Sequence, residues 1–407
     1  MWKTMLRLVE AIVIRSAPGV LNLITLLLIG KWMPATDYGA YSTVVATSGL
    51  VSSVAFGPFA FAIVSQHAKI AAEGKIKEYE SSLVSLSALV SLVLAVLVSV
   101  PAYFGLVPWT FIAPFVAFGF YTTVQEILHA RLSLWLYGTA SLAQSIAYIL
   151  LAWVIVRPNP TPSMALIAFS ASYAVAAGIS LLLSRPAISL LPRFSVVMET
   201  LRVGGTYTLS TIAEQCLYLG MRYLLLWFGT AQHLGIFSFS VDLAQRVVGF
   251  IINASSFITV PNAFKHASKG DTSEFRRTLM GGAAMAALCS FVALTGIMAF
   301  YETGYFTALS SDLFSPLSFV IVSIAIMLNR TKKMAVDPIA INNRRPLSIA
   351  LGYVLGIPVM IVSFAGLTGF GISLGFELSY FFAYCASTLM TLLLVRHQSW
   401  ATGRICE

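Results

Sequence analysis

Apolar runs, each long enough to cross a lipid bilayer as an α-helix, recur along the whole chain. A membrane helix needs about 20 mostly apolar residues. Twelve runs of about this length are predicted as membrane helices: 8–30, 39–65, 82–105, 109–130, 138–156, 163–184, 203–229, 235–261, 278–300, 312–329, 346–368 and 372–395. Only 10% of the residues are charged and 58% are hydrophobic, whereas a soluble domain carries about 25% charged residues. The sequence therefore predicts an all-α, polytopic membrane protein with about twelve transmembrane helices. Soluble enzymes, nucleic-acid binders and disordered chains are excluded.

The distribution of basic residues predicts how these helices are oriented. If the N-terminus is cytoplasmic, twenty of the 25 Lys and Arg residues lie on the cytoplasmic side, and only Lys31 and Arg157 lie on the other. Arg15, Arg222 and Arg246 fall within the spans. An excess of basic residues in cytoplasmic loops is the positive-inside pattern. We therefore expect both termini in the cytoplasm, and we attribute the net charge of +9 to topology rather than to nucleic-acid binding.

The chain contains an internal repeat. Residues 39–78 align with residues 235–274 without a gap, at an offset of 196, and share ten identities. The identities in the polar loop after the helix are Lys69/Lys265, Ala71/Ala267, Gly74/Gly270 and Glu78/Glu274. The sequence thus predicts two pseudo-symmetric six-helix bundles, 1–184 and 203–407, joined by a cytoplasmic connector at 185–202. Because each bundle has an even number of helices, the repeat is parallel, an architecture found in transporters.

Two matched bends are also expected, at Pro18-Gly19 in the first helix and at Gly204-Gly205 in the seventh. Proline removes a backbone hydrogen bond and kinks a helix. Broken helices at matched positions point to the moving parts of a transporter, whereas a static kink is the alternative interpretation.

Motifs for enzymatic chemistry are missing from the sequence. It has no phosphate-binding loop, no HExxH or DxD motif, and no His/Cys cluster at metal-ligand spacing. Cys216, Cys289, Cys385 and Cys406 are too far apart for a metal knuckle or a CxxC pair. Neither a metal nor a cofactor is predicted. A membrane glycosyltransferase or polymerase would need larger external loops than the one near residues 302–312, so a non-enzymatic protein is expected.

Three segments resemble motifs of the polysaccharide (O-antigen type) flippases, which share a superfamily with the multidrug and toxic-compound exporters. Residues 30–41 read GKWMPATDYGAY, like the family's LGPxxYGxY. Residues 269–277 read KGDTSEFRR, like its GDxxxxRR loop. Residues 366–375 read GLTGFGISLG, like the junction between its last two helices. The resemblance extends from the first helix to the last, and the helix count agrees.

The resemblance implies a transporter that flips an undecaprenyl-diphosphate-linked oligosaccharide across the bacterial cytoplasmic (inner) membrane by alternating access. The product would enter surface polysaccharide biosynthesis, as O-antigen of lipopolysaccharide or as exopolysaccharide. Implied partners are the lipid-linked oligosaccharide, membrane lipids, and a polysaccharide polymerase with glycosyltransferases; nucleic acid is not among them. The alternatives are a cation-coupled multidrug exporter of the same superfamily and, less favoured, a membrane glycosyltransferase or polymerase.

Charged residues inside the predicted spans are the candidate functional residues, because a charge at mid-bilayer costs at least about 2.5–3.5 kcal/mol on insertion scales. Arg15, Arg222 and Arg246 are predicted to hold the diphosphate in a central cationic cavity, since the arginine fork matches phosphate oxygens. Asp242 lies four residues before Arg246, close enough to pair on one helix face. That pair is interpreted either as a structural ion pair or as one that releases Arg246 to the substrate.

Further polar residues within the spans are candidates for ion coupling or for lining the cavity. Glu126 and His129 share a helix face, and a histidine near a carboxylate titrates near neutral pH; an ordinary interhelix hydrogen bond is the alternative. Glu214 and Arg222 also share a face and are predicted to line a polar cavity wall. Glu377 is set aside as interfacial. Three arginines against three acids give no acidic excess, which disfavours a drug exporter.

Overall fold

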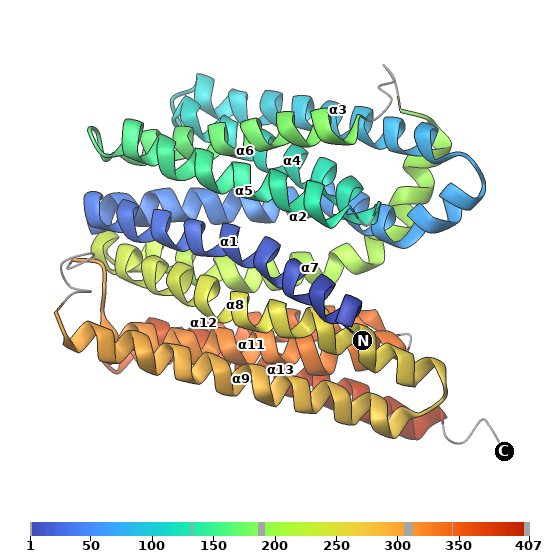
Figure 1. The fold of residues 1–407 in the computed structure, drawn as a ribbon. Helices are drawn as coiled ribbons and strands as arrows, with labels where there is room; N and C mark the ends of the chain where they lie inside the picture. Colours follow the sequence, from blue (N-terminus) through green and yellow to red (C-terminus); the bar gives the residue numbers. More distant parts are fainter. Residues whose placement is uncertain (1, 132, 186–191, 305–311, 344, 403–407) are drawn as a thin grey trace. The chain divides into compact units, whose positions relative to one another are not determined.

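The computed structural model describes residues 2–131, 133–185, 192–304, 312–343 and 345–402, and it describes side chains in the first helix only from Ala17 onward. The described chain is helical and contains no strand (Figure 1). The long helices of the first half are α1 (Trp2–Trp32), α2 (Ala35–Ala72), α3 (Ile76–Tyr103), α4 (Ile112–Ala130), α5 (Leu134–Leu151) and α6 (Pro162–Ser184). Those of the second half are α7 (Phe194–Phe228), α8 (Ala231–Ser268), α9 (Thr272–Glu302), α11 (Pro316–Asn342), α12 (Pro346–Gly369) and α13 (Gly375–Thr402). The predicted all-α fold class is confirmed.

Nine of the described helices are long and apolar enough to cross a membrane, and α1 contributes a shorter apolar stretch, Ala17–Trp32. The two remaining long helices, α7 and α11, carry several charged residues. Large apolar side chains cover the outer faces of the others, including Leu92 and Leu97 on α3 and Val292 on α9. Apolar exposure on this scale marks a surface that meets lipid, so the chain is a multi-pass membrane protein.

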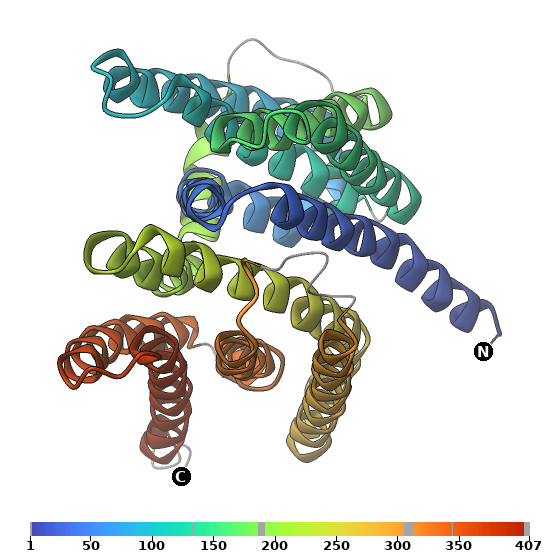
Figure 2. The same cartoon turned by 90° about the vertical axis from the view of Figure 1, so that its left-hand side faces the viewer.

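The chain divides into two compact units, Met1–Ile212 and Ala213–Glu407, and the division falls inside α7. The predicted bundle limits, 1–184 and 203–407, stay a prediction. In the first unit α4 packs against α2, α3 and α6, and α5 packs against α1 and α6. In the second unit α11 lies between the α8–α9 pair and the α12–α13 pair (Figure 2). The fourth long helix of each half therefore has the most helical neighbours.

The repeat found in the sequence is confirmed by the helix bounds. Helices α2 and α8 each have 38 residues, and both their first and their last residues are 196 positions apart. Helices α3 and α9 begin at the same offset, at Ile76 and Thr272. The loops before them contain Gly74 and Gly270, whose φ angles are +73° and +78°. Only glycine adopts this left-handed conformation without a steric cost, which explains why this loop residue is identical in both halves.

The two predicted bends do not break their helices, and matched bending stays a prediction. Helices α1 and α7 are both continuous, through Pro18 and through Gly204-Gly205 respectively. The two helices end at Trp32 and Phe228, again 196 residues apart, and in that register Gly204 does not correspond to Pro18. Gly204 instead allows close contact between helices, because a Cβ there would lie 2.1 Å from the carbonyl oxygen of Pro58 in α2.

Candidate functional site: buried ion pairs within each unit

Arg222 of α7 is the largest fully buried side chain of the second unit. Its Nη2 donates to Asp242 Oδ1 of α8 at 2.6 Å, and its Nε donates to Ser238 Oγ at 3.3 Å. The guanidinium lies 4.5 Å from the ring centroid of Tyr218, whose hydroxyl also donates to Asp242. Tyr218 and Arg222 are four residues apart on α7, and Ser238 and Asp242 are four apart on α8, so one face of each helix supplies the whole set.

The ion pair of Asp242 is therefore with Arg222 of the neighbouring helix, and not with Arg246 as expected. Sequence spacing identifies partners on one helix only, whereas this partner is brought close by the packing of α7 on α8. Arg246 is half-buried on α8. The side chain of Arg15 lies outside the described residues.

A second set of polar residues joins α7 to α11. Glu214 of α7 is buried, pairs with Lys333, and accepts a hydrogen bond from Asn329 Nδ2 at 3.1 Å. Tyr353 of α12 donates to Asn329 Oδ1 at 2.8 Å. The sequence prediction ended this span at residue 329, whereas the helix α11 continues to Asn342 and includes Lys332 and Lys333. The apolar Met334-Ala335-Val336 after the basic pair is the sequence signal that the helix continues.

Lys332 and Asp337 form another ion pair on α11, and sequence analysis did not identify either residue as functional. The Lys332 side chain is fully buried, its Nζ lies 3.8 Å from Asp337 Oδ1, and it sits 3.5 Å from the ring centroid of Tyr353. Arg330 of the same helix donates to the side-chain oxygen of Gln245 in α8. The helices α7, α8 and α11 thus contribute seven Lys and Arg residues (Arg202, Arg222, Arg246, Lys265, Arg330, Lys332 and Lys333) and four Asp and Glu residues (Glu199, Glu214, Asp242 and Asp337).

In the first unit, Glu126 and His129 of α4 are in contact, as their spacing predicts: His129 Nδ1 lies 2.9 Å from Glu126 Oε2. Both side chains are partly exposed. A role in ion coupling stays a prediction. Glu377, expected at an interface, is buried in the second unit and accepts a hydrogen bond from Ser318 Oγ at 2.8 Å.

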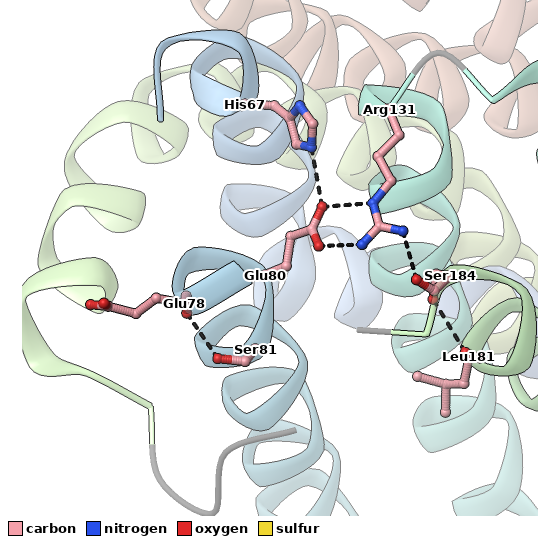
Figure 3. Close-up of polar contacts among 7 residues, drawn as sticks. All are labelled: His67, Glu78, Glu80, Ser81, Arg131, Leu181 and Ser184. Atoms are coloured by element: carbon pink, nitrogen blue, oxygen red, sulfur yellow. Dashed lines mark hydrogen bonds and ion pairs between the residues drawn. The ribbon is translucent and has the colours of Figure 1, made fainter. Parts of the chain in front are cut away.

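Glu80 of α3 is the best-satisfied buried carboxylate of the first unit (Figure 3). Its carboxylate accepts hydrogen bonds from Nε (2.8 Å) and Nη2 of Arg131, the residue that follows α4. Its Oε1 also lies 3.1 Å from Nε2 of His67 in α2. Arg131 Nη1 also donates to the carbonyl oxygen of Ser184, the last residue of α6, at 2.6 Å. The Glu80 hydrogen bond raises the pKa of Arg131 above its ordinary value. One carboxylate thereby links the ends of four helices.

Sequence analysis missed Glu80, because it lies in a run of alternating charges that resembles a surface loop. The helix α3 begins at Ile76 rather than near residue 82, which places Glu80 inside the bundle. At the repeat offset of 196, the second half has Arg276 at this position. The Glu80 cluster therefore belongs to the first unit and not to the repeat.

Among the described residues, no three His, Cys, Asp or Glu side chains gather as a metal site. Comparison with known proteins gives no match to any protein-family model or to any curated protein sequence. Solved structures do match. The inward-facing conformation of a multidrug resistance MATE family transporter of the MOP superfamily has a TM-score of 0.69 at 14% identity, covering 98% of this chain and 100% of that one.

Two further solved structures are similar over most of the chain. The lipid II flippase MurJ in an inward closed conformation has a TM-score of 0.67 at 12% identity, covering 95% of this chain and 87% of that one. A MOP superfamily transporter from Pyrococcus furiosus, described as having a binding pocket of reverse polarity, has a TM-score of 0.60 at 14% identity, covering 96% and 94%. At these identities the likeness establishes the fold: the chain has the fold of the MOP superfamily transporters.

Proposed function

We propose that the protein is a membrane transporter that flips a lipid-linked oligosaccharide by alternating access, with the lipid diphosphate as the group it recognises. The observation that carries this proposal is the excess of Lys and Arg over Asp and Glu on α7, α8 and α11, seven against four. A diphosphate needs such an excess, because its negative charge must be balanced where water is scarce. The similarity to a lipid II flippase is in keeping with a lipid-linked substrate.

Arg246 is the proposed first contact of the diphosphate. It lies one turn beyond Asp242 on α8 and is half-buried, whereas Arg222 is fully enclosed by Asp242, Ser238 and Tyr218. Arg222 would reach the substrate only after its pair with Asp242 separates, although its Nη1 has no hydrogen-bond partner among the described residues. Arg15 is proposed as a third ligand on sequence grounds.

A cation-coupled multidrug exporter is the second candidate function, favoured by the similarity to a multidrug MATE transporter. A cationic drug would be repelled by the same excess of basic side chains. The flippase therefore accounts better for the charge of the second unit. We further propose that the protein works in the bacterial inner membrane beside a polysaccharide polymerase and glycosyltransferases.

Reporter fusions test the proposed orientation, in which both termini are cytoplasmic. Fusions after Gly74, Gly270 and Asn343 are expected to report the cytoplasm, and fusions after Asn159 and Gly304 the outside. The reason is the concentration of Lys and Arg around the first group of loops. The measurement is paired phosphatase and β-galactosidase activity. A cytoplasmic signal at both Asn159 and Gly304 would contradict the arrangement.

Deletion of the gene tests the substrate class. Cells without the protein should accumulate lipid-linked oligosaccharide in the inner leaflet and lose surface polysaccharide. Wild-type protein should restore the polysaccharide, and Arg246→Ala should not, because the diphosphate loses a cation. Arg276→Ala is the matched control, since Arg276 is exposed at the start of α9. Raised drug sensitivity with normal surface polysaccharide would favour the exporter instead.

A further inference from the structure

Lys332 and Asp337 of α11 form a buried pair that, among the described residues, no hydrogen bond joins or supports at Lys332 Nζ or Asp337 Oδ1. Lys332 Nζ and Asp337 Oδ1 are 3.8 Å apart, beyond hydrogen-bond distance, and neither atom has a hydrogen-bond partner among the described residues. The ring of Tyr353 covers the ammonium at 3.5 Å. A buried ammonium and carboxylate held in this way keep much of their desolvation cost, because an ion pair offsets that cost only with good geometry and further hydrogen bonds.

Asp337 is the counter-charge of Lys332, because the other charged groups nearby already have partners. The other charged groups that act on the pair are Glu214 of α7 and Lys333 of α11. Glu214 is already paired with Lys333 and hydrogen-bonded by Asn329. Arg330 of α11 is held by Gln245 of α8, and the ionisable side chains of α12 and α13 near Glu214 are the buried Tyr353 and Tyr384. Lys332 and Asp337 therefore balance each other.

The fold itself does not require these two charges. Helices α4 and α11 hold the same place in their halves, and each is followed by a three-residue connection to the next helix. Counted back from the helix ends at Ala130 and Asn342, the residues of α4 that correspond to Lys332 and Asp337 are Phe120 and Gln125. An uncharged pair therefore serves the first unit, so the charged pair of the second unit calls for a functional explanation.

We propose that Lys332 and Asp337 form a proton-exchange site that couples proton movement to the transport cycle. This inference rests on the proposed transport function and adds the coupling ion to it. In the first step one N–H bond of the Lys332 ammonium breaks and an O–H bond forms on Asp337, leaving a neutral amine and a neutral carboxylic acid. A neutral pair is favoured wherever burial penalises unsatisfied charges.

Two further proton transfers complete the cycle. Asp337 keeps a small exposed surface, whereas Lys332 has none. The carboxylic acid is thus the member that releases its proton to water, after which it is again a carboxylate. The amine of Lys332 then takes up one proton from water when the cycle next opens the site. One proton enters and one leaves in each cycle, and no other reactant is needed.

Infrared difference spectroscopy of the purified, reconstituted protein tests the site without any substrate. Between alkaline and acidic pH, the wild type should show the C=O stretch of a carboxyl group that gains a proton. Asp337→Asn should remove that band. Lys332→Arg should also remove it, because arginine keeps the charge but does not give up its proton. Glu377→Gln, which changes another buried carboxylate of the same unit, should keep the band.

A band that persists in folded Asp337→Asn protein, or that is unchanged in Lys332→Arg, would overturn the proposal. If Asp337→Asn does not fold, Lys332→Arg decides, since it preserves the ion pair. Normal transport by Lys332→Arg across the pH range would also overturn it. These outcomes are separate from the substrate test: a wild-type band that depends on Asp337, in a protein whose deletion leaves surface polysaccharide intact, refutes the flippase and retains the proton site.

Discussion

Replacing Arg222 by Met should deplete the folded protein from the membrane. The change removes the guanidinium that neutralises Asp242 from a carboxylate to which the hydroxyl of Tyr218 also donates at 3.3 Å. Breaking a buried pair from one side typically costs about 3–5 kcal/mol, whereas replacing both members by apolar residues is often neutral. We therefore expect low abundance for Arg222→Met and for Asp242→Leu, and recovery in the double variant. Quantitative immunoblotting of membranes measures all three.

Transport by the double variant then separates a structural pair from a substrate ligand. If Arg222 serves only to neutralise Asp242, the double variant should restore surface polysaccharide together with abundance. If Arg222 also contacts the diphosphate, abundance should return without transport. Low abundance in the double variant would contradict the pair argument itself, because the two side chains would then contribute through other contacts.

Replacing Gly204 by Ala should strongly destabilise the fold, and Gly205→Ala is the matched control at the next residue. The added Cβ would lie 2.1 Å from the carbonyl oxygen and 2.6 Å from the Cα of Pro58, so backbone rather than a flexible side chain must move. Overpacking costs about 1–3 kcal/mol, and occasionally more, so we expect a loss of about 3 kcal/mol. Gly57 of α2, whose added Cβ would lie 3.1 Å from Thr208, lies at the same close approach.

Gly205→Ala should leave the stability unchanged or raise it. Among the described residues, no atom beyond the adjoining turns of α7 lies within 4 Å of a Cβ at Gly205, and alanine is favoured over glycine in a helix interior by about 1 kcal/mol. Thermal unfolding of the purified protein in detergent should therefore show a lower midpoint for Gly204→Ala and an unchanged or higher one for Gly205→Ala. Equal midpoints would show that α2 and α7 separate without cost.

The membrane helices were predictable because run length and apolar composition are local properties of the sequence. The repeat was predictable for a related reason. Gly74 and Gly270 both have a positive φ angle, which favours glycine, so their identity in the two halves does not follow from a shared apolar composition. The end of α11 was not, since Arg330, Lys332 and Lys333 together read as a loop. Inside the unit Lys332 is balanced by Asp337 of the same helix, whereas Glu214 of α7 and Gln245 of α8 are brought to Lys333 and Arg330 by packing.

The same distinction applies to the individual site residues. The contact of Glu126 with His129 was predictable, because residues three apart on a helix meet whatever surrounds them. The partner of Asp242 was not, because Arg222 and Asp242 are 20 residues apart and meet only through the packing of two helices. Glu80 and Arg131, 51 residues apart, are a similar case. Spacing thus identifies neighbours within a helix, and contacts between helices require the tertiary structure.

Helices α2 and α8 are equally long, and the offset between the two halves stays the same from the end of α1 to the start of α3. This regularity limits where the chain can accept an inserted residue. An α-helix turns by about 100° and rises 1.5 Å per residue. A single-residue insertion within α2 would therefore rotate His67 away from Glu80 and displace the joint at Gly74.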